Sequence, residues 1–207
     1  LKIIGKKKLI GGKFSVMPDR IEAGTFILAV LGCKGKIKLT NLNIDLIKHL
    51  INIFSSISEL HFKISKDKTM LEVLCMKRVK KNLKIKTDIY PGFPTDLQAQ
   101  LMAAMSISDC KTKIEETIFE NRFMHVQELI RMGADISLKG SNAIIVGKKK
   151  LNGAEVMATD LRASSSLIIA GLMADGLTTI NRIYHLDRGY ENLVEKLSSC
   201  CAEIKRI

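Results

Sequence analysis

The sequence predicts one α/β domain built from three copies of a β-α-β-α-β unit, related by pseudo-threefold symmetry. Two blocks share their letters, Gly5-Lys-Lys-Lys-Leu9 and Gly147-Lys-Lys-Lys-Leu151. An aspartate precedes an apolar helical segment three times, at Asp19, Asp96 and Asp160. Each copy alone is too small to bury a core, so we expect the three copies to pack their apolar helices around a common centre.

The first half of each copy contains a strand, the aspartate and an apolar helix. The apolar helices are expected over Ile21–Val30, Leu97–Met105 and Leu161–Met173. The strand of the middle copy is Leu83–Ile85. Residues 1 to about 18 resemble the segment Asn142–Thr159, so we expect them to pack as strands of this domain.

The second half of each copy contains a short strand, an amphipathic helix and a closing strand, followed by a strand that leads into the next copy. The short strands are expected over Lys36–Leu39, Thr112–Ile114 and Thr178–Ile180. Helical spacing of apolar residues predicts helices over Asp45–Phe54, His125–Met132 and Tyr190–Leu197. The closing strands are Leu60–Ile64, Asp135–Leu138 and Glu203–Ile207. The copies therefore cover about residues 1–70, 71–140 and 141–207 of one domain.

Composition places the chain among globular, non-membrane proteins. Of its 207 residues, 46% are hydrophobic and 26% are charged, which is ordinary for a folded domain. No apolar run approaches the roughly 20 residues of a membrane helix. The five cysteines lack a C-x-x-C spacing, so a disulfide framework or zinc site is disfavoured and a cytoplasmic location is predicted.

The net charge of +12 raises the alternative of a nucleic-acid partner. However, 25 of the 33 basic residues are lysines spread along the whole chain. Dispersed lysines are typical of a solvated surface, and they indicate a polyanion-binding site less strongly than a cluster of basic residues does. The charge would also help to collect small anionic substrates.

The three aspartates have two possible roles. Each lies where a loop becomes a helix, so each is a natural helix cap. Asp96 is the strongest functional candidate, because Pro91, Gly92 and Pro94 constrain the segment that leads to it. A carboxylate held there could act as a general base.

Arginine is scarce, with eight residues, yet three of them lie in the most distinctive segments, at Arg122, Arg162 and Arg188. A guanidinium binds phosphate or carboxylate through two parallel hydrogen bonds, which lysine cannot reproduce. Pairing with the nearby acids Glu120 or Asp187 is the alternative. The sequence alone leaves both possibilities open.

Three blocks carry a resemblance to a known family: Tyr90-Pro-Gly-Phe-Pro-Thr-Asp96, Thr117-Ile-Phe-Glu-Asn-Arg122-Phe-Met-His-Val and Asp160-Leu-Arg162. They resemble the enolpyruvyl transferases, and among these the UDP-N-acetylglucosamine 1-carboxyvinyltransferases of peptidoglycan synthesis. The resemblance implies an inside-out α/β barrel, with helices inside and sheets outside. It covers only the second of that family's two domains.

The resemblance also implies roles for individual residues. Asp96 would contact the sugar hydroxyl as general base, Arg162 and Arg188 would face phosphoenolpyruvate, and Arg122 would lie near Asp96. The catalytic candidates are Asp96, Asp160, Arg162 and Arg188. The substrate-binding candidates are Asp96, Ile118, Phe119, Arg122, Arg162 and Arg188.

The implied reaction transfers an enolpyruvyl group from phosphoenolpyruvate to the 3-hydroxyl of UDP-N-acetylglucosamine. No metal or organic cofactor is expected. The family's other domain supplies a Lys-Asn pair and a cysteine loop that protonates phosphoenolpyruvate, and neither has a counterpart here. We therefore expect the missing N-terminal domain to be the main partner and the isolated chain to be inactive.

Three alternatives remain. The shikimate-pathway enolpyruvyl transferase is disfavoured by the segment Thr117–Val126, because that enzyme carries a Lys-Glu-Ser-Asp-Arg type of segment there. An RNA-binding or RNA-processing module of related repeats would account for the net charge. A catalytically inactive domain used for assembly is the third.

Overall fold

The computed structural model describes residues 1–207. Eight helical segments are present, two of them short 3-10 helices. They are α1 (Arg20–Cys33), α2 (Ile44–Phe54), η1 (Thr95–Leu97), α3 (Gln98–Met105), α4 (Val126–Arg131), α5 (Leu161–Met173), η2 (Ile183–Arg188) and α6 (Leu193–Ser199). None of the helices is both long enough and apolar enough to cross a membrane.

Eleven strands form four small sheets. The strands are β1 (Lys36–Leu39), β2 (Leu60–Ile64), β3 (Leu71–Cys75), β4 (Leu83–Lys86), β5 (Lys111–Glu115), β6 (Asp135–Lys139), β7 (Asn142–Val146), β8 (Leu151–Asn152), β9 (Glu155–Met157), β10 (Ala174–Asp175) and β11 (Thr179–Asn181). The sheet orders are β1-β3-β2, β4-β5-β7-β6, β10-β8 and β11-β9.

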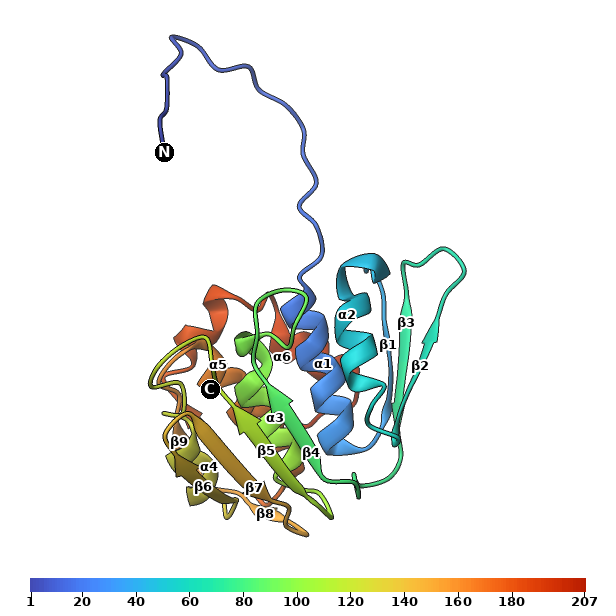
Figure 1. The fold of residues 1–207 in the computed structure, drawn as a ribbon, viewed down its shortest axis with the longest axis vertical. Helices are drawn as coiled ribbons and strands as arrows, with labels where there is room; N and C mark the ends of the chain where they lie inside the picture. Colours follow the sequence, from blue (N-terminus) through green and yellow to red (C-terminus); the bar gives the residue numbers. More distant parts are fainter.

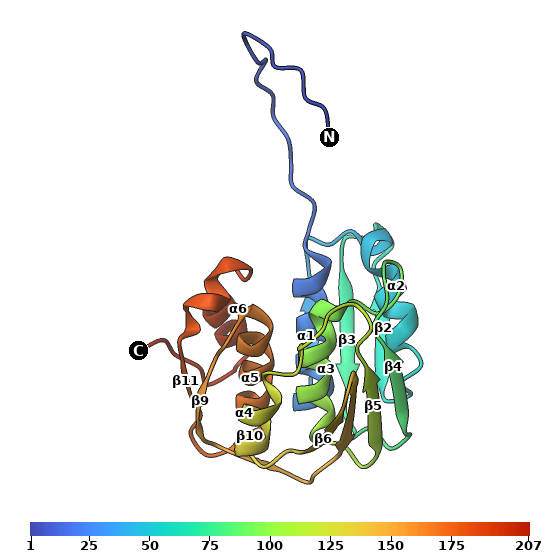
Figure 2. The same cartoon turned by 60° about the vertical axis from the view of Figure 1, so that its left-hand side comes forward.

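Three apolar helices form the centre of the molecule. Figures 1 and 2 show α1, α3 and α5 side by side, with the sheets outside them. All of α3 is buried, as is α1 from Ala23 to Gly32. A helix that is apolar on every side must be covered on every side, so the sheets and outer helices surround this trio. The expected inside-out arrangement is confirmed.

The sheets repeat the same pairing. β3 lies between β1 and β2 in antiparallel register, and β7 lies between β5 and β6 in the same way. In the second copy β4 adds in parallel to β5, pairing Leu83 with Thr112. In the third copy β9 adds in parallel to β11, pairing Val156 with Ile180. The strands β3 and β7 are the predicted links into the next copy.

The closing strand expected over Glu203–Ile207 is wrong, because these residues form no strand. In the first two copies the closing strand pairs only with the strand that follows it, β2 with β3 and β6 with β7. No such following strand exists within residues 1–207. The segment therefore has no partner for its backbone groups.

The expectation that residues 1–18 pack as strands is also wrong. They form no strand, nearly all of their side chains are exposed, and Figure 1 shows them extending away from the start of α1. The shared letters include Leu151, which lies in β8. However, a strand forms only where a neighbour pairs with its backbone groups, and the letters of a segment do not specify that neighbour.

Candidate active site

The three aspartates at equivalent helix starts have different partners. Asp19 Oδ1 accepts the backbone N–H of Ile21 at 2.7 Å, so Asp19 caps α1. Asp160 Oδ1 accepts the N–H groups of Arg162 and Ala163 at 2.7 and 3.0 Å, so Asp160 caps α5. Asp96 caps no helix through its side chain. The capping interpretation is confirmed for Asp19 and Asp160 and is wrong for Asp96.

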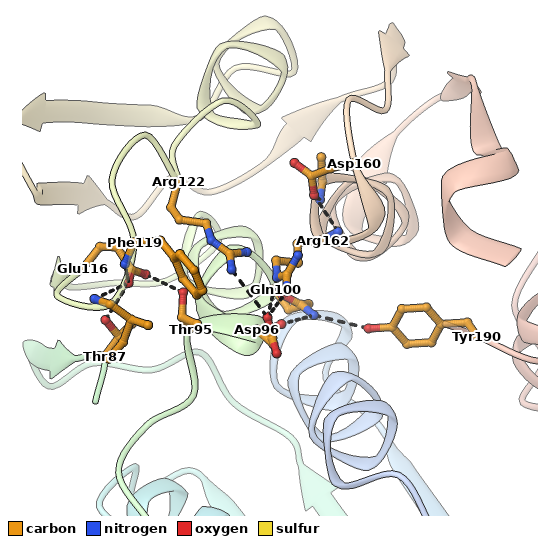
Figure 3. A network of polar contacts seen from close by, with 12 residues as sticks. Thr87, Thr95, Asp96, Gln100, Glu116, Phe119, Arg122, Asp160, Arg162 and Tyr190 are labelled. Carbon is orange, nitrogen blue, oxygen red and sulfur yellow. Dashed lines mark hydrogen bonds and ion pairs between the residues drawn. The ribbon is translucent and has the colours of Figure 1, made fainter. Parts of the chain in front are cut away.

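The Asp96 carboxylate instead faces two arginines (Figure 3). Arg162 approaches Asp96 Oδ1 with its Nε at 2.5 Å and also contacts it through Nη2. Arg122 Nη2 lies 3.8 Å from the same oxygen. The shortest contact of each pair falls on Oδ1, and Oδ2 accepts no hydrogen bond from the protein. The structure thus brings together three candidates that lie in three separate segments of the sequence.

Arg122 is the most deeply placed of the three, with its side chain only 17% exposed. Its guanidinium carbon lies 4.3 Å from the centre of the Phe119 ring, in a cation–π contact. Burial, and after it the neighbouring Arg162 cation, lowers the pKa of Arg122, while Asp96 opposes this effect. Arginine remains protonated under such conditions, so the site keeps two cations against one carboxylate.

A buried polar network supports Asp96 on the side that faces the central helices. Gln100 Nε2 donates to the Asp96 carbonyl oxygen at 2.8 Å, and it also contacts the hydroxyls of Thr25 at 3.2 Å and Tyr190 at 3.3 Å. The two hydroxyls lie 2.8 Å apart. Sequence reasoning missed these residues. Their signal was the presence of Thr25 and Gln100 inside otherwise apolar helices.

A second buried network surrounds Glu116, a residue that is only 3% exposed and that sequence reasoning also missed. Four groups donate to its carboxylate. They are the Thr87 and Thr95 hydroxyls, both at 2.9 Å, and the backbone N–H groups of Ile118 at 2.9 Å and Phe119 at 3.2 Å. A carboxylate at the end of a strand, in a pair of adjacent glutamates, was the only signal available.

Two cavities adjoin the cluster. The larger has a volume of about 730 Å³ and is lined by residues 116–124 together with Leu138, Gly140 and Ser141. The smaller, of about 170 Å³, includes Asp96, Arg20 and Tyr90 in its wall. Ile118 lines both. The predicted substrate-contacting residues Ile118, Phe119 and Arg122 therefore share one pocket beside Asp96.

Arg188 is the one arginine candidate that does not join the cluster. It lies at the end of η2, is exposed, and its side chain makes no hydrogen bond or ion pair. Its neighbour Asp187 pairs with Arg206 Nη2 at 2.5 Å, so the alternative of an Asp187–Arg188 pair is not observed. Tyr190, two residues further on, does reach Gln100.

His125 lies directly before α4 and is buried, and its Nε2 has no hydrogen-bond partner. Burial lowers the pKa of His125 to about 4, and the nearby Asp160 carboxylate opposes this only in part. The imidazole is therefore neutral at physiological pH.

Comparison with known proteins places this geometry in a family. The family model for EPSP synthase (3-phosphoshikimate 1-carboxyvinyltransferase) matches residues 1–197. UDP-N-acetylglucosamine 1-carboxyvinyltransferases from Orientia tsutsugamushi (strain Ikeda) and Geobacter metallireducens are 49% and 50% identical over all 207 residues. The chain spans about half the length of these relatives, 48% and 49%.

Solved structures agree with the sequence comparison. The enolpyruvyl transferase NikO from Streptomyces tendae is similar over 92% of this chain and 44% of its own, with a TM-score of 0.79 and 26% identity. An EPSP synthase from Acinetobacter baumannii shares the fold over 87% of this chain and 44% of its own, with a TM-score of 0.59 and 18% identity. Residues 1–207 therefore belong to the EPSP synthase family of enolpyruvyl transferases.

Proposed function

We propose that this chain provides half of the active site of an enzyme that transfers an enolpyruvyl group from phosphoenolpyruvate to the 3-hydroxyl of UDP-N-acetylglucosamine. One observation carries the proposal. The Asp96 carboxylate caps no helix, and it is held between Arg122 and Arg162 beside a pocket of about 730 Å³. The names of the relatives support the choice of sugar nucleotide.

The proposed reaction is an addition followed by an elimination. Asp96 accepts the proton of the sugar hydroxyl, and the hydroxyl oxygen bonds to C2 of phosphoenolpyruvate while the methylene carbon takes a proton from a donor outside this chain. The tetrahedral intermediate then loses that methyl proton and phosphate, which restores the double bond. Because Oδ1 already carries the arginine contacts, Oδ2 is the oxygen available to act as general base.

The arginines would stabilise anionic charge during both steps. Arg162 is placed to bind a carboxylate or phosphate oxygen as well as Asp96, and a desolvated cation is an effective partner for developing negative charge. Arg188 would join when the site closes around substrate. Ile118 and Phe119 would line the sugar-nucleotide pocket, and Asp160 would act by fixing the start of α5 beneath Arg162.

We further propose that residues 1–207 form one domain of three copies, about 1–70, 71–140 and 141–207, that works against a second domain. The rest of the active site would come from the part of the protein that this chain does not cover. All five cysteines are free thiols, which suits a cytoplasmic enzyme.

The test uses a fusion in which residues 1–207 replace the part of the Orientia tsutsugamushi relative that they match. Phosphate release is measured with phosphoenolpyruvate and either UDP-N-acetylglucosamine or shikimate 3-phosphate as acceptor. We expect release with the sugar nucleotide only. Release with shikimate 3-phosphate only would overturn the proposed acceptor.

A further inference from the structure

The Glu116 carboxylate connects two parts of the site that are far apart in sequence. Its Oε2 accepts the hydroxyl of Thr95, the residue directly before Asp96, at 2.9 Å. Its Oε1 accepts the N–H groups of Ile118 and Phe119 at 2.9 and 3.2 Å, at the wall of the large pocket. The Glu116 side chain therefore hydrogen-bonds both to the residue before Asp96 and to the wall of the large pocket (Figure 3).

Thr87, at the end of β4, completes this connection. Its hydroxyl donates to Glu116 Oε1 at 2.9 Å and accepts the N–H of Thr117 at 2.8 Å. The Thr117 hydroxyl donates back to the Thr87 carbonyl oxygen at 2.5 Å. The pocket wall is thus attached to the sheet by side chains as well as by the backbone of β5.

The groups that contact the Glu116 side chain are those expected around a buried carboxylate. Four donors point at Glu116 and no acceptor does, which matches an ionised carboxylate, a group that can only accept. Glu116 is 3% exposed, and a buried carboxylate without such donors would be strongly unfavourable. Removing it would leave two buried hydroxyls and two part-buried N–H groups without this acceptor, all of them next to the site.

The effect of Glu116 on the arginines is indirect. Fixing the Phe119 backbone also fixes the ring on which the Arg122 guanidinium lies at 4.3 Å. Fixing Thr95 fixes the first turn that carries Asp96, and Gln100 holds the Asp96 carbonyl oxygen from the other side at 2.8 Å. Asp96 and Arg122 are thereby held at their 3.8 Å separation.

We propose that Glu116 is a positioning residue for the transfer reaction. It holds the Asp96 carboxylate at a fixed position relative to the sugar-nucleotide pocket. The kinetic effect expected from this proposal depends on the proposed function. The structural part, the control of the Ile118–Phe119 backbone by Glu116, stands independently. The Glu116 carboxylate is occupied by protein donors, and it acts through Thr95, Ile118 and Phe119.

The kinetic test compares Glu116→Ala, Glu116→Gln and, as the matched control, Glu115→Ala in the fusion. Displacing catalytic groups by about 1 Å costs on the order of 100-fold in rate, so we expect Glu116→Ala to lower kcat by about that factor. We also expect it to raise the KM for UDP-N-acetylglucosamine about tenfold and to leave the KM for phosphoenolpyruvate within about threefold. The control should behave as wild type.

Glu116→Gln provides the rescue. The glutamine carbonyl oxygen can still accept from Thr87, Ile118 and Phe119, and the Thr95 hydroxyl can rotate to accept from the amide nitrogen. We therefore expect Glu116→Gln to restore kcat to within about tenfold of wild type. If Glu116→Ala lowered only the melting temperature and left both KM values and kcat unchanged, Glu116 would be a purely structural residue and the proposal would be overturned.

Hydrogen exchange in the chain alone separates this proposal from the proposed function. In Glu116→Ala the amides of Thr117, Ile118 and Phe119 should lose protection at least tenfold more than those of the core strand β7, whereas Glu115→Ala should show no such difference. Uniform loss across the chain would contradict the positioning role, whatever the fusion does. An inactive wild-type fusion together with the local loss would instead contradict the proposed function alone.

Discussion

Asp19, Asp96 and Asp160 occupy the same position in three copies, yet only two of them cap a helix. Asp19 and Asp160 accept backbone N–H groups at 2.7 Å. Asp96 lies within the 3-10 helix η1, which follows Pro94, and its side chain is turned toward Arg122 and Arg162. The local segment before the helix, and not the aspartate itself, decides which role the carboxylate takes.

The first prediction concerns Asp96→Asn in the fusion. Asp96 caps no helix, and asparagine has nearly the same shape as aspartate, but asparagine cannot accept the sugar's proton. We expect turnover to fall by about 10²–10⁴-fold, the usual contribution of a general base, with the fold retained. Phosphate release and thermal melting should be measured together.

Asp19→Asn is the control for this substitution, because Asp19 holds the equivalent position and acts as a cap. It should change neither turnover nor melting appreciably. Turnover of Asp96→Asn within a few-fold of wild type would refute the role of Asp96 as base.

At the scale of elements, the sequence predicted the helices and the internal strands well, and it failed for the strands expected at the two ends of residues 1–207. The helix Leu161–Met173 and the strands Lys36–Leu39 and Leu60–Ile64 have the predicted bounds. The errors, at residues 1–18 and 203–207, involve strands. A helix satisfies its backbone hydrogen bonds within itself, whereas a strand depends on a neighbour that periodicity cannot reveal.

The second prediction concerns the contact between the central helices. A Cβ added at Gly24 in α1 would lie 2.4 Å from Leu97 Cδ1, and Leu97 is fully buried. Gly24→Ala should therefore lower the free energy of unfolding by about 1–3 kcal/mol through overpacking, offset by up to about 1 kcal/mol of helix propensity. Denaturant unfolding measures the difference.

Gly35→Ala is the matched control, because a methyl group added at Gly35 would meet no atom within 4 Å. It should change the free energy of unfolding by no more than about 0.5 kcal/mol. Equal stabilities for the two variants would show that α1 and η1 do not pack as closely as described.

The third prediction concerns His125 at the start of α4. In the folded chain its pKa is about 4, whereas an unfolded histidine takes up its proton near pH 6.5. The unfolded state therefore binds more protons between these values, and stability falls as the pH is lowered from about 6.5 to 4. The full loss from this residue is roughly 3 kcal/mol, at about 1.4 kcal/mol for each pH unit.

Urea unfolding at several pH values measures this effect. His125→Asn should show a shallower loss of stability across that pH range than wild type, whatever its absolute stability. His61→Asn, which changes an exposed residue on β2, should keep the wild-type slope. An unchanged slope in His125→Asn would mean that the buried imidazole is not the source of the acid sensitivity.

At the scale of the whole molecule, Asp96 lies in η1 directly before α3, Arg162 lies in the first turn of α5, and Arg122 reaches them from the loop between β5 and α4. The distinctive sequence blocks predicted Asp96, Arg122 and Arg162, since a carboxylate and arginines in constrained loops indicate anion chemistry. They could not predict Gln100, Tyr190 or Glu116. These residues act through long-range hydrogen bonds, which have no local pattern in the sequence.

Phosphate release should be measured for residues 1–207 alone and for the fusion, side by side, with phosphoenolpyruvate and UDP-N-acetylglucosamine. This comparison shows whether residues 1–207 hold a complete active site or half of one. We expect release by the fusion and none above background by the chain alone, because losing part of a catalytic constellation typically costs many orders of magnitude. Turnover by the isolated chain at more than a trace rate would contradict the claim that it holds only half of the active site.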